Sequence, residues 1–526
     1  MSAELQKYQR TRLLEQSRSI TDFDVIVIGG GATGLGAALE AVTRGYKTLL
    51  LEQVDFAKGT SSKSTKLVHG GVRYLAQGDV KLVREASIER GLLVQNAPHL
   101  VRNQTFIIPV YSFFDRIKYT IGLKLYDWIA GKLSLGSSVF VNRSAVMPRI
   151  STIKENGLKG GVQYHDGQFD DARLAINLMQ TIIDKGGVAL NYMKVTGLSK
   201  NDQGILNGVH AIDQETQEPY YYGANAVINA TGVFVDDVLK MEKPDSENTI
   251  RVSQGVHLVF DKKFWPGTDA LMIPETSDGR VLFAVPWHNK VVVGTTDTPV
   301  EHASLDPVAL EKEVNFILNT AAAYLKEAPT RSDVLSVFAG LRPLAAPKKG
   351  SQKTKEISRS HKVSITEAHL FTLLGGKWTT FRKMAEDIID AIEKHKGWKP
   401  TQTQTRHLPV HGATQLHDWS YRFFYYGSDA AAIEEAINQS EENWLNETLQ
   451  IHPAQVRWAI RFEQARTIED FLSRRTRVLL LDADTALQLA PSVAAIMAKE
   501  LNRDENWQQQ QVKQFEELCK DYRLKH

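Results

Sequence analysis

Cysteine is nearly absent from the sequence, in which Cys519 is the only such residue among 526. One thiol excludes an intramolecular disulfide and any zinc or iron–sulfur site that needs several thiolates. Long apolar runs are absent as well. The longest uncharged apolar stretch covers residues 25–39, is interrupted by glycines, and is shorter than the ~18 residues that a membrane span needs. We therefore expect neither a disulfide scaffold nor a transmembrane helix.

An excess of charge of either sign is also missing, since 63 Lys and Arg residues oppose 61 Asp and Glu residues. The formal net charge of +2 gives no basis for binding polyanions, and no nucleic-acid partner is expected. The first twenty residues are polar and lack the apolar core of a secretion signal, so a cytoplasmic location is expected. The C-terminal part contains no Asp-x-Asp-x-Asp-Gly loop, and we predict no metal site.

A strand, a glycine-rich turn, a helix and a second strand follow one another near the N-terminus. Residues 24–28 are apolar and rich in β-branched side chains, as in a fully buried strand. Residues 37–44 are good helix formers, Gly45 terminates the helix, and residues 47–51 form the return strand. This βαβ order predicts a parallel sheet at the N-terminal end of an α/β protein.

Further along the chain, the patterns alternate between helix and strand. Helical periodicity covers residues 171–185, a short buried strand covers 226–229, and strand-like segments separated by turns occupy 252–296. Helical patterns return at 381–394 and continue from 428 onward. We therefore predict a second, antiparallel sheet domain and a C-terminal helical domain.

The turn after the first strand has the spacing of a dinucleotide-binding loop. Gly29, Gly31 and Gly34 match Gly-x-Gly-x-x-Gly between a strand and a helix. In such a loop the first glycine permits the tight turn, the second lets the backbone approach a pyrophosphate, and the third lets helix and strand pack closely. The helix N-terminus supplies amide donors, and Glu52, at the end of the second strand, is placed to bind the ribose hydroxyls. This segment predicts a bound dinucleotide.

Two later segments favour FAD over NAD as that dinucleotide. Ala230, Thr231 and Gly232 follow a buried strand, as in flavoproteins whose chain returns to the FAD domain. Gly375 and Gly376 precede another helix, whose N-terminus is suited to face the flavin end. Either segment alone is compatible with an ordinary strand-to-helix turn, but two such returns favour FAD.

A further set of sequence blocks, spread over most of the chain, carries a family resemblance. The longest block is Gly59-Thr-Ser-Ser-Lys-Ser-Thr-Lys-Leu-Val-His-Gly-Gly-Val-Arg-Tyr-Leu75. The others, in chain order, are Asp170–Arg173, Asn229–Gly232, Pro286–Trp287, Gly294–Asp297, Gly340–Pro343, Gly375–Arg382 and Ser473–Arg477. Together they resemble the FAD-dependent glycerol-3-phosphate dehydrogenases, a family within the D-amino-acid-oxidase-like flavoproteins. The resemblance covers residues 22–385 well and the C-terminal part more loosely.

The resemblance implies an α/β protein with a Rossmann-like FAD-binding domain, an antiparallel-sheet substrate domain and a C-terminal helical domain. An N-terminal extension precedes the usual start of the family and has no expected role. The expected bounds are 22–100 with 160–250 and 335–398 for the FAD-binding domain, 101–159 with 251–334 for the substrate domain, 399–526 for the helical domain, and 1–21 for the extension.

The resemblance also implies oxidation of sn-glycerol 3-phosphate to dihydroxyacetone phosphate by hydride transfer to FAD. The electrons would then pass to ubiquinone or menaquinone in the membrane. The alternative is a glycerol-3-phosphate oxidase, which passes the electrons to oxygen and releases hydrogen peroxide. The substrate motifs do not separate these enzymes, because they differ only in the second half-reaction. A flavin-bound protein without catalysis would instead lack the reactive side chains described next.

Five side chains are the predicted catalytic and substrate-binding groups. His69 lies in the segment that the resemblance places beside the flavin ring, and it is the expected general base because imidazole titrates near neutral pH. Arg73 and Arg342 are expected to bind the substrate phosphate through their guanidinium forks. Lys377 is expected near the flavin pyrimidine, where a cation stabilises the reduced ring, and Tyr74 is expected to hydrogen-bond the substrate.

Further residues are secondary predictions. Ser61, Ser62 and Val195 are expected to contact FAD. Thr379 is expected to do the same, although a threonine in this position by default caps the following helix. His257 is a weaker site candidate, because a histidine in a sheet is more often part of a core.

Residues 113–132 form an amphipathic stretch. Apolar side chains recur at spacings of three and four, with basic residues between them. Such a stripe usually packs on a core, but it can also lie in a bilayer interface. Because the resembling dehydrogenases look like monotopic enzymes, we expect peripheral contact with the inner face of the cytoplasmic membrane.

The helical tail leaves two alternatives open. It is suited to mediating a homodimer or to covering the FAD-binding domain. Three basic side chains in its conserved-looking block are as compatible with a solvated surface as with an interface, namely Arg474, Arg475 and Arg477.

Overall fold

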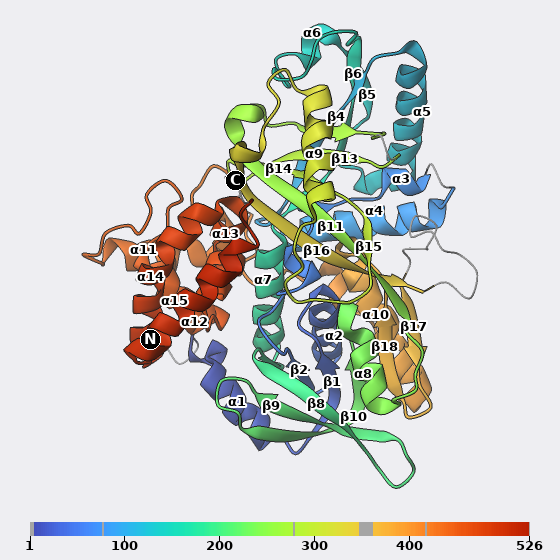
Figure 1. Cartoon of the computed structure of the whole chain (residues 1–526). Helices are drawn as coiled ribbons and strands as arrows, with labels where there is room; N and C mark the ends of the chain where they lie inside the picture. Colours follow the sequence, from blue (N-terminus) through green and yellow to red (C-terminus); the bar gives the residue numbers. More distant parts are fainter. Residues whose placement is uncertain (1–4, 76–77, 277–278, 347–360, 416–417, 525–526) are drawn as a thin grey trace.

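The structure is a computed structural model that describes residues 5–75, 78–276, 279–346, 361–415 and 418–524. Figure 1 shows three regions: a mainly parallel sheet covered by helices, a larger and mainly antiparallel sheet beside it, and a cluster of helices from the C-terminal part. This arrangement confirms the predicted fold class.

The first sheet has eight strands and a parallel centre. β1 (Asp22–Ile28) lies between β10 (Pro219–Asn229) and β2 (Thr48–Leu51) and runs parallel to both. α2 (Ala32–Thr43) connects β1 to β2, which confirms the predicted βαβ unit. The strand order is β17-β18-β10-β1-β2-β7, with β8 and β9 attached to β10. The other strands are β7 (Val188–Leu190), β8 (Met193–Lys200), β9 (Leu206–Asp213), β17 (Lys362–Ile365) and β18 (Leu370–Leu374).

Helices on the parallel sheet complete its core. α2 packs between α7 (Asp171–Asp184) and α10 (Phe381–Lys396), and both of these helices were predicted. Gly36 makes this packing possible, because a Cβ at this position would lie 2.8 Å from the Phe381 ring of α10. Close contact between the helices therefore fixes where α2 begins.

The second sheet has ten strands in the order β15-β11-β14-β13-β12-β4-β6-β3, with β16 paired to β11 and β5 paired to β6. All of these pairs are antiparallel except β12 with β4. The strands are β3 (Leu67–Val68), β4 (Val101–Val110), β5 (Val139–Asn142), β6 (Gly160–Phe169), β11 (Ile250–Asp261), β12 (Ala270–Ile273), β13 (Leu282–Trp287), β14 (Lys290–Gly294), β15 (Thr298–Val300) and β16 (Val334–Ala345).

Some strands that the predicted bounds place in the FAD-binding domain pair in the second sheet, among them β3, β6 and β16. β6 was assigned to the FAD-binding domain, but it pairs with β4 along its whole length from Gly160 to Phe169. β16 was also assigned to that domain, but it pairs with β11 in the second sheet. Each strand leads the chain from the second sheet back to the first. The sequence analysis predicts neither strand, and local sequence does not tell which sheet supplies a strand's partner.

The C-terminal part is helical, as predicted. The π-helical turn Asp470–Arg475 places the Arg474 and Arg475 side chains against Asp55, at 2.5 Å each. Arg477 pairs with Asp170 at 2.8 Å. All three arginines are buried, so they form an interface with the FAD-binding domain and are not solvated. The helices are α11 (Ala430–Asn438), α12 (Pro453–Glu463), α13 (Val478–Leu481), α14 (Ala483–Glu500) and α15 (Glu505–Lys520).

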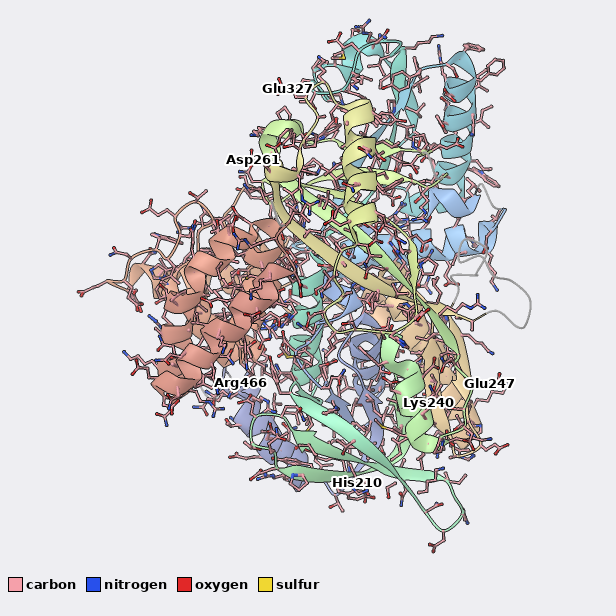
Figure 2. All side chains as sticks on the ribbon, in the orientation of Figure 1. His210, Lys240, Glu247, Asp261, Glu327 and Arg466 are labelled. Atoms are coloured by element: carbon pink, nitrogen blue, oxygen red, sulfur yellow. The ribbon has the colours of Figure 1, made fainter. Side chains whose placement is uncertain are left out.

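A further ion pair joins the helical domain to the first sheet. Arg466, labelled in Figure 2, donates hydrogen bonds of 2.5 and 2.7 Å to the two carboxylate oxygens of Glu215. Bidentate pairs of this kind fix orientation as well as distance. The tail therefore covers the FAD-binding domain, which is one of the two alternatives expected for it.

The N-terminal extension is also part of the packed structure. It forms η1 (Leu5–Tyr8) and α1 (Arg10–Ser19). The Tyr8 and Leu13 side chains are buried in the core of the first sheet, and buried Arg10 pairs with Asp213 at 3.0 Å. The segment that had no expected role thus stabilises the edge of the FAD-binding domain.

α5 (Phe113–Ala130) is the predicted amphipathic helix, and its apolar stripe is exposed. Only Leu123, Tyr126 and Ala130 are buried among its residues. In the part of the chain that the structure describes, no helix is both long and apolar enough to span a membrane. The other α-helices are α3 (Val72–Leu75), α4 (Val80–Asn96), α6 (Arg143–Val146), α8 (Val235–Glu242) and α9 (Glu311–Tyr324).

Candidate active site

The glycine loop after β1 can be built only from glycine at two of its three positions. Gly29 has φ +109°, and a Cβ there would lie 2.7 Å from the Ala230 carbonyl oxygen. A Cβ on Gly34 would lie 1.8 Å from the Gly29 carbonyl oxygen. Both contacts are too close for any other residue. The tight turn and the close helix–strand packing predicted for this loop are therefore present.

The N-terminus of α2 and the end of β2 face the same space. The Glu52 carboxylate accepts hydrogen bonds from the Gly30 N–H at 2.6 Å and from the Val54 N–H at 3.0 Å. Burial raises the pKa of Glu52. The Ala32 N–H, at the start of α2, donates to Ser61 Oγ at 2.9 Å. A ribose beside Glu52 and a pyrophosphate beside the α2 amides would find the partners that such groups need.

A cavity of about 460 Å³ lies over this loop. Its walls include most of the predicted cofactor-binding residues, namely Gly29, Gly31, Glu52, Ser61, Val195, Ala230, Thr231, Gly232, Gly375 and Gly376. Ser62 is buried, lines neither this cavity nor its neighbour, and accepts a hydrogen bond from the Lys66 ammonium through its carbonyl oxygen. Ser62 thus stands behind the cavity wall in this structure, and its predicted contact with FAD stays a prediction.

A second cavity, of about 280 Å³, continues from the first. The two share Thr60, Pro343 and residues 375–378. Trp378, which the sequence analysis overlooked, lies at this junction and donates its indole N–H to the Ser61 carbonyl oxygen at 2.8 Å. Together the two cavities form an elongated space, with the Glu52 carboxylate at one end and room for a ring system at the other. This space fits FAD, with the adenosine near Glu52 and the flavin near Trp378.

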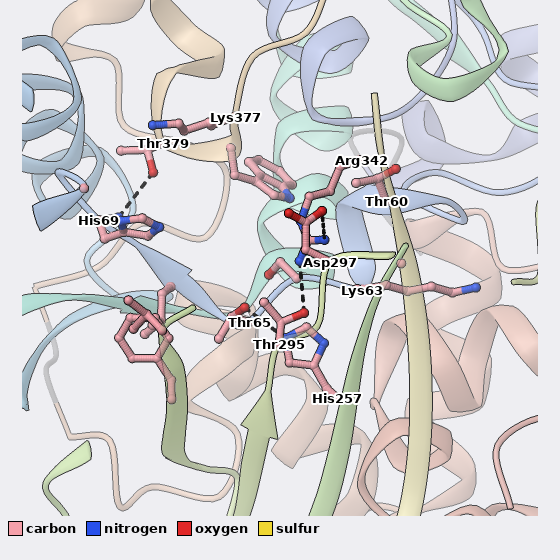
Figure 3. A pocket seen from close by; sticks show the side chains of 18 of the residues that line it. Thr60, Lys63, Thr65, His69, His257, Thr295, Asp297, Arg342, Lys377 and Thr379 are labelled. Atoms are coloured by element: carbon pink, nitrogen blue, oxygen red, sulfur yellow. Dashed lines mark hydrogen bonds and ion pairs between the residues drawn. The ribbon is translucent and has the colours of Figure 1, made fainter. Parts of the chain in front are cut away.

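The second cavity brings together three of the five predicted catalytic and substrate-binding residues, namely His69, Arg342 and Lys377 (Figure 3). His69, Lys377 and Thr379 lie on one side of the view, and Arg342 lies on the other. The His69 backbone N–H donates to Thr379 Oγ1 at 3.2 Å. Thr379 Oγ1 therefore holds the His69 backbone, and the N-cap residue of α10 is its neighbour Thr380. The cavity places His69, Arg342 and Lys377 around one space.

Arg342 projects from β16 into this cavity. Its Nη2 donates to Thr295 Oγ1 at 3.0 Å, and its Nη1 lies 3.7 Å from an Asp297 carboxylate oxygen. Ser253 also donates its hydroxyl to Asp297, so that carboxylate is shared. A Cβ on Gly255 would lie 2.2 Å from the guanidinium, which shows that glycine on the neighbouring strand makes room for Arg342. The guanidinium is thus held in one place with a side open to the cavity.

His257 is a site residue that the sequence analysis ranked only as a weak candidate. It lies on β11, lines the cavity, and stacks on Phe338 with ring centres 4.9 Å apart. Its Nε2 shares a 2.9 Å hydrogen bond with Thr65 Oγ1, and its Nδ1 has no hydrogen-bond partner among the described residues. Burial, with the nearby charges of Arg342 and Lys66, holds the pKa of His257 well below its usual value. His257 is therefore a neutral imidazole beside a guanidinium.

Lys63 is another cavity residue that the sequence analysis did not single out. Its ammonium donates to the Leu305 carbonyl oxygen at 3.3 Å and lies 3.6 Å from an Asp306 carboxylate oxygen. Burial lowers the pKa of Lys63 to about 8, and the charge of Lys58 acts in the same direction. Its position in the Gly59–Leu75 block was visible in the sequence, but nothing there indicates burial.

A buried polar network supports the loop that carries His69. Tyr126 on α5 donates its hydroxyl to Asp166 at 3.0 Å, and Arg90 donates to both residues, at 2.7 Å to Asp166 and 3.0 Å to Tyr126. A Cβ on Gly70 would lie 2.4 Å from the Tyr126 hydroxyl. The backbone next to His69 therefore rests directly on a side chain of α5.

Arg73 and Tyr74 belong to α3, which follows the His69 loop. Their side chains lie outside the described part of the structure. Their predicted roles in binding the phosphate and the substrate therefore stay predictions.

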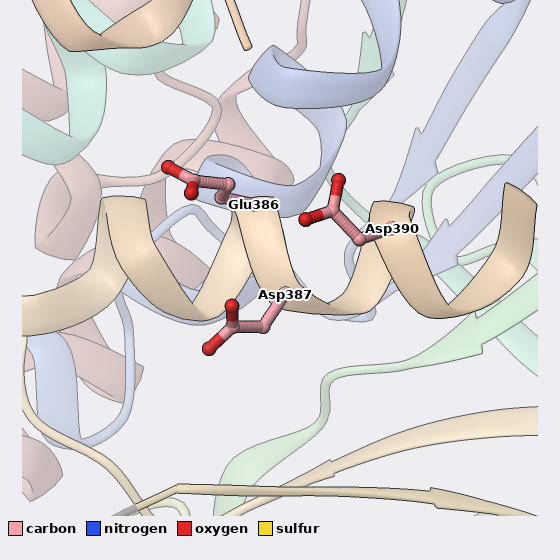
Figure 4. Close-up of side chains that lie close together, drawn as sticks. All are labelled: Glu386, Asp387 and Asp390. Carbon is pink, nitrogen blue, oxygen red and sulfur yellow. The ribbon is translucent and has the colours of Figure 1, made fainter. Parts of the chain in front are cut away.

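One group of carboxylates has the spacing of a metal site (Figure 4). Glu386, Asp387 and Asp390 lie close together on α10. Each already pairs with a cation: Glu386 with Arg382 at 2.7 Å, Asp387 with Lys383 at 2.7 Å, and Asp390 with Arg44 at 2.7 Å. The group is a salt-bridged helix surface and gives no reason to infer a metal ion.

Comparison with known proteins agrees with an FAD site in the first cavity, which is called the FAD cradle below, and with a substrate site in the second. The family model for FAD-dependent oxidoreductases matches residues 24–376, and the model for the C-terminal domain of alpha-glycerophosphate oxidase matches residues 371–509. The mitochondrial glycerol-3-phosphate dehydrogenase of Bos taurus is 37% identical over 94% of this chain and 73% of its own length. For that of Schizosaccharomyces pombe the values are 36%, 94% and 87%.

A solved structure extends the similarity to three dimensions. The glycerol-3-phosphate dehydrogenase of Bacillus halodurans, complexed with FAD, is similar over 98% of each chain with a TM-score of 0.80 and 28% identity. Fold and site thus define a flavoprotein of the FAD-dependent oxidoreductase class, with FAD as its cofactor. Within that class, the chain belongs to the family of FAD-dependent glycerol-3-phosphate dehydrogenases.

Proposed function

We propose that the protein oxidises sn-glycerol 3-phosphate to dihydroxyacetone phosphate and passes the electrons through FAD to a membrane quinone. The observation that carries the first half is the cavity beside the FAD cradle, which holds Arg342, His257, His69 and Lys377. A phosphorylated secondary alcohol needs a fixed cation for its phosphate and a neutral base for its hydroxyl proton. This cavity supplies both.

The charged and neutral side chains of the cavity have different roles. Bound FAD supplies the hydride acceptor. Arg342 binds the substrate phosphate, because its guanidinium lines the cavity and its planar fork can meet two phosphate oxygens at once. Lys377 follows the Gly375–Gly376 turn at the junction of the two cavities and adds positive charge where the flavin lies. The anionic substrate is thereby oriented with its carbon skeleton between the phosphate site and the flavin.

The hydroxyl proton has two candidate acceptors, and the geometry favours His257. Its imidazole lines the cavity, is neutral, and lies near Arg342. A neutral imidazole is the form that accepts a proton, and the approach of an anionic substrate raises its affinity for one. His69, the predicted base, also lines the cavity and remains the second candidate.

The proposed acceptor is a quinone because α5 presents an apolar face that none of the described residues covers. Phe114 is 83% exposed and Trp128 is 77% exposed. Six of the thirteen exposed large apolar side chains among the described residues belong to this one helix, namely Phe113, Phe114, Ile117, Ile121, Leu125 and Trp128. Lys118 and Lys124 add charges that suit anionic lipid headgroups. We infer that α5 binds peripherally to the inner face of the cytoplasmic membrane. This position would bring the protein to the bilayer in which quinone is dissolved.

The alternative acceptor is oxygen. It is favoured by the match of residues 371–509 to the C-terminal domain of an oxidase. The FAD-loaded protein should be reduced with sn-glycerol 3-phosphate, then mixed either with a short-chain quinone or with oxygenated buffer. Rapid reoxidation by quinone with little peroxide is the expected result. Stoichiometric peroxide formation at a comparable rate would identify an oxidase.

Turnover itself is tested by the product. FAD-loaded protein incubated with sn-glycerol 3-phosphate and a soluble quinone should release dihydroxyacetone phosphate in step with quinone reduction. Glycerol, which lacks the phosphate, should react far more slowly because Arg342 then has nothing to bind. Equal rates with both alcohols would overturn the phosphate role of the cavity.

The two histidines are separated by a matched pair of substitutions. His257→Asn and His69→Asn each remove an imidazole from the same cavity. Loss of a general base slows the chemical step by about 10²–10⁴-fold. We expect His257→Asn to slow flavin reduction to this degree, and His69→Asn to slow it less. The reverse order would assign the base to His69.

A further inference from the structure

A third cavity, of about 610 Å³, lies apart from the FAD and substrate cavities. It shares no lining residue with either of them. Its walls come from the start of β4, the end of β6, the β13–β14 turn and the segment Trp419–Phe424 of the C-terminal part. Neither half of the proposed reaction uses this space.

Arg102 is the most informative residue of this cavity. Its Nε donates to Gln168 Oε1 at 2.6 Å, and its guanidinium lies 5.3 Å from the centre of the Trp419 ring. No carboxylate of the described residues forms an ion pair with it. Burial lowers the pKa of Arg102, as expected for a guanidinium that has lost water without gaining an anion. A half-buried arginine without an acid is costly unless an anion joins it.

The carboxylates that line the cavity do not supply that anion, because their charges are already balanced. Asp170 pairs with Arg477 at 2.8 Å and with His288 at 2.9 Å. Asp269 pairs with Arg149 at 2.5 Å. Lys262 lines the cavity without an ion pair among the described residues. The cavity therefore carries an excess of positive charge.

Lys290 adds a further cation with only a partial counter-charge. It lines the cavity and lies 3.1 Å from a carboxylate oxygen of Asp261, an aspartate that Figure 2 labels at the end of β11. Asp261 is itself half exposed to solvent, which weakens the pair. Two to three cations around one space suit a phosphate, which carries more charge than a carboxylate.

Aromatic rings form the rest of the wall. Trp287 and Phe169 come from the second sheet, and Trp419 and Phe424 come from the C-terminal part, where their ring centres are 4.8 Å apart. Rings beside cations suit a ligand that has both a flat aromatic part and a phosphate. Asn289, an amide side chain of the cavity wall, can bond the edge of such a ring or a ribose.

We propose that this cavity binds a nucleoside phosphate, with the phosphate on Arg102 and Lys262 and the base against Trp419. The site is independent of the substrate cavity and does not rest on the proposed reaction. Its volume exceeds that of the substrate cavity, as a nucleotide requires more room than a three-carbon phosphate.

The proposal is tested by titrating ADP into the FAD-loaded full chain in a calorimeter. FAD occupies the adenosine pocket beside Glu52, so ADP cannot bind there. Saturable binding of one ADP per chain is expected, with inorganic phosphate and adenosine each binding at least tenfold more weakly. Arg102→Gln and Trp419→Leu should each weaken ADP binding at least tenfold, whereas Arg406→Gln, at an exposed position, should leave it unchanged.

Three results would overturn the proposal. The first is no saturable ADP binding to the FAD-loaded wild-type protein. The second is binding that Arg102→Gln and Trp419→Leu both leave unchanged. The third is inorganic phosphate binding as tightly as ADP, which would mark an adventitious anion site only. Flavin absorption and thermal unfolding show whether each variant is folded. If Arg102→Gln does not fold, the ADP affinity of Trp419→Leu alone tests the proposal.

Discussion

Arg342 receives its position from two neighbours, Thr295 and Asp297, and its space from Gly255. Replacing it with glutamine keeps a polar group of similar reach but removes the charge that binds phosphate. A hydrogen bond to a charged group is worth roughly 1.5–3 kcal/mol. We expect Arg342→Gln to raise KM for sn-glycerol 3-phosphate by about 10- to 100-fold. Steady-state kinetics with a soluble quinone measure this, and an unchanged KM contradicts the phosphate role.

The Tyr126 hydroxyl is the residue-scale link between α5 and the His69 loop. Tyr126→Phe removes its 3.0 Å hydrogen bonds with Asp166 and Arg90 but keeps the ring beside Gly70. We expect slower flavin reduction with little change in KM, because the loop is less well fixed while the phosphate site is intact. Tyr119→Phe on the same helix is the matched control. An equal effect of both substitutions would make the role of Tyr126 merely structural.

Single residues also show how far sequence reasoning reaches. Gly29, Gly34 and Glu52 were predicted because the spacing of a glycine loop is local and its physical demands are strict. His257 was ranked low because nothing adjacent to it in sequence reveals Arg342, on the neighbouring strand β16, or Thr65, in the loop before β3. The sequence likewise does not tell that Ser61 lines the cofactor cavity while neighbouring Ser62 lies behind it, since successive residues in a turn point in different directions.

At the scale of elements, α5 is the part that the account assigns to the membrane. Phe114→Asp combined with Trp128→Asp places a charge near each end of the exposed apolar face, on its two most exposed side chains. We expect the double variant to stay in solution when wild-type protein sediments with anionic vesicles, while its turnover with a soluble quinone is retained. Tyr221→Asp on β10, at the other end of the molecule (Figure 1), is the control for an exposed aromatic residue. Equal sedimentation of both variants contradicts the assignment.

Elements were predicted better than their partners. The helical periodicity of residues 113–130 gave α5 correctly, because the 3.6-residue repeat is visible in one segment. The same repeat does not tell whether a neighbour covers the apolar stripe. β6 and β16 were not predicted as strands, and their place in the second sheet depends on pairing with β4 and β11, which lie elsewhere in the sequence.

At the scale of the whole molecule, His411 joins two domains. Its Nδ1 lies 2.9 Å from Asp184 on α7, and its Nε2 lies 2.9 Å from Asp429 beside α11. Burial lowers the pKa of His411, but the hydrogen bonds and charges of both aspartates more than offset this and raise it to about 9. Because the folded pKa exceeds the unfolded value, the pair stabilises the fold fully below about pH 6.5 and is lost as the pH rises through about 9.

Denaturant unfolding of wild-type protein and His411→Asn measures this contribution. The two free energies of unfolding should differ by roughly 3 kcal/mol at pH 6 and converge above pH 9, since each pKa unit corresponds to about 1.4 kcal/mol. A difference that does not depend on pH would show that His411 acts by packing alone. The contact was not predictable from sequence, because Asp184 and His411 are 227 positions apart.

The central claim is that a phosphorylated secondary alcohol in the cavity of Arg342 and His257 gives its hydride to FAD in the adjoining cradle. The most direct measurement is anaerobic mixing of the FAD-loaded protein with sn-glycerol 3-phosphate while the long-wavelength flavin absorption is recorded. The account predicts rapid and complete bleaching, with one dihydroxyacetone phosphate formed per flavin. Flavin that stays oxidised at saturating substrate would contradict it.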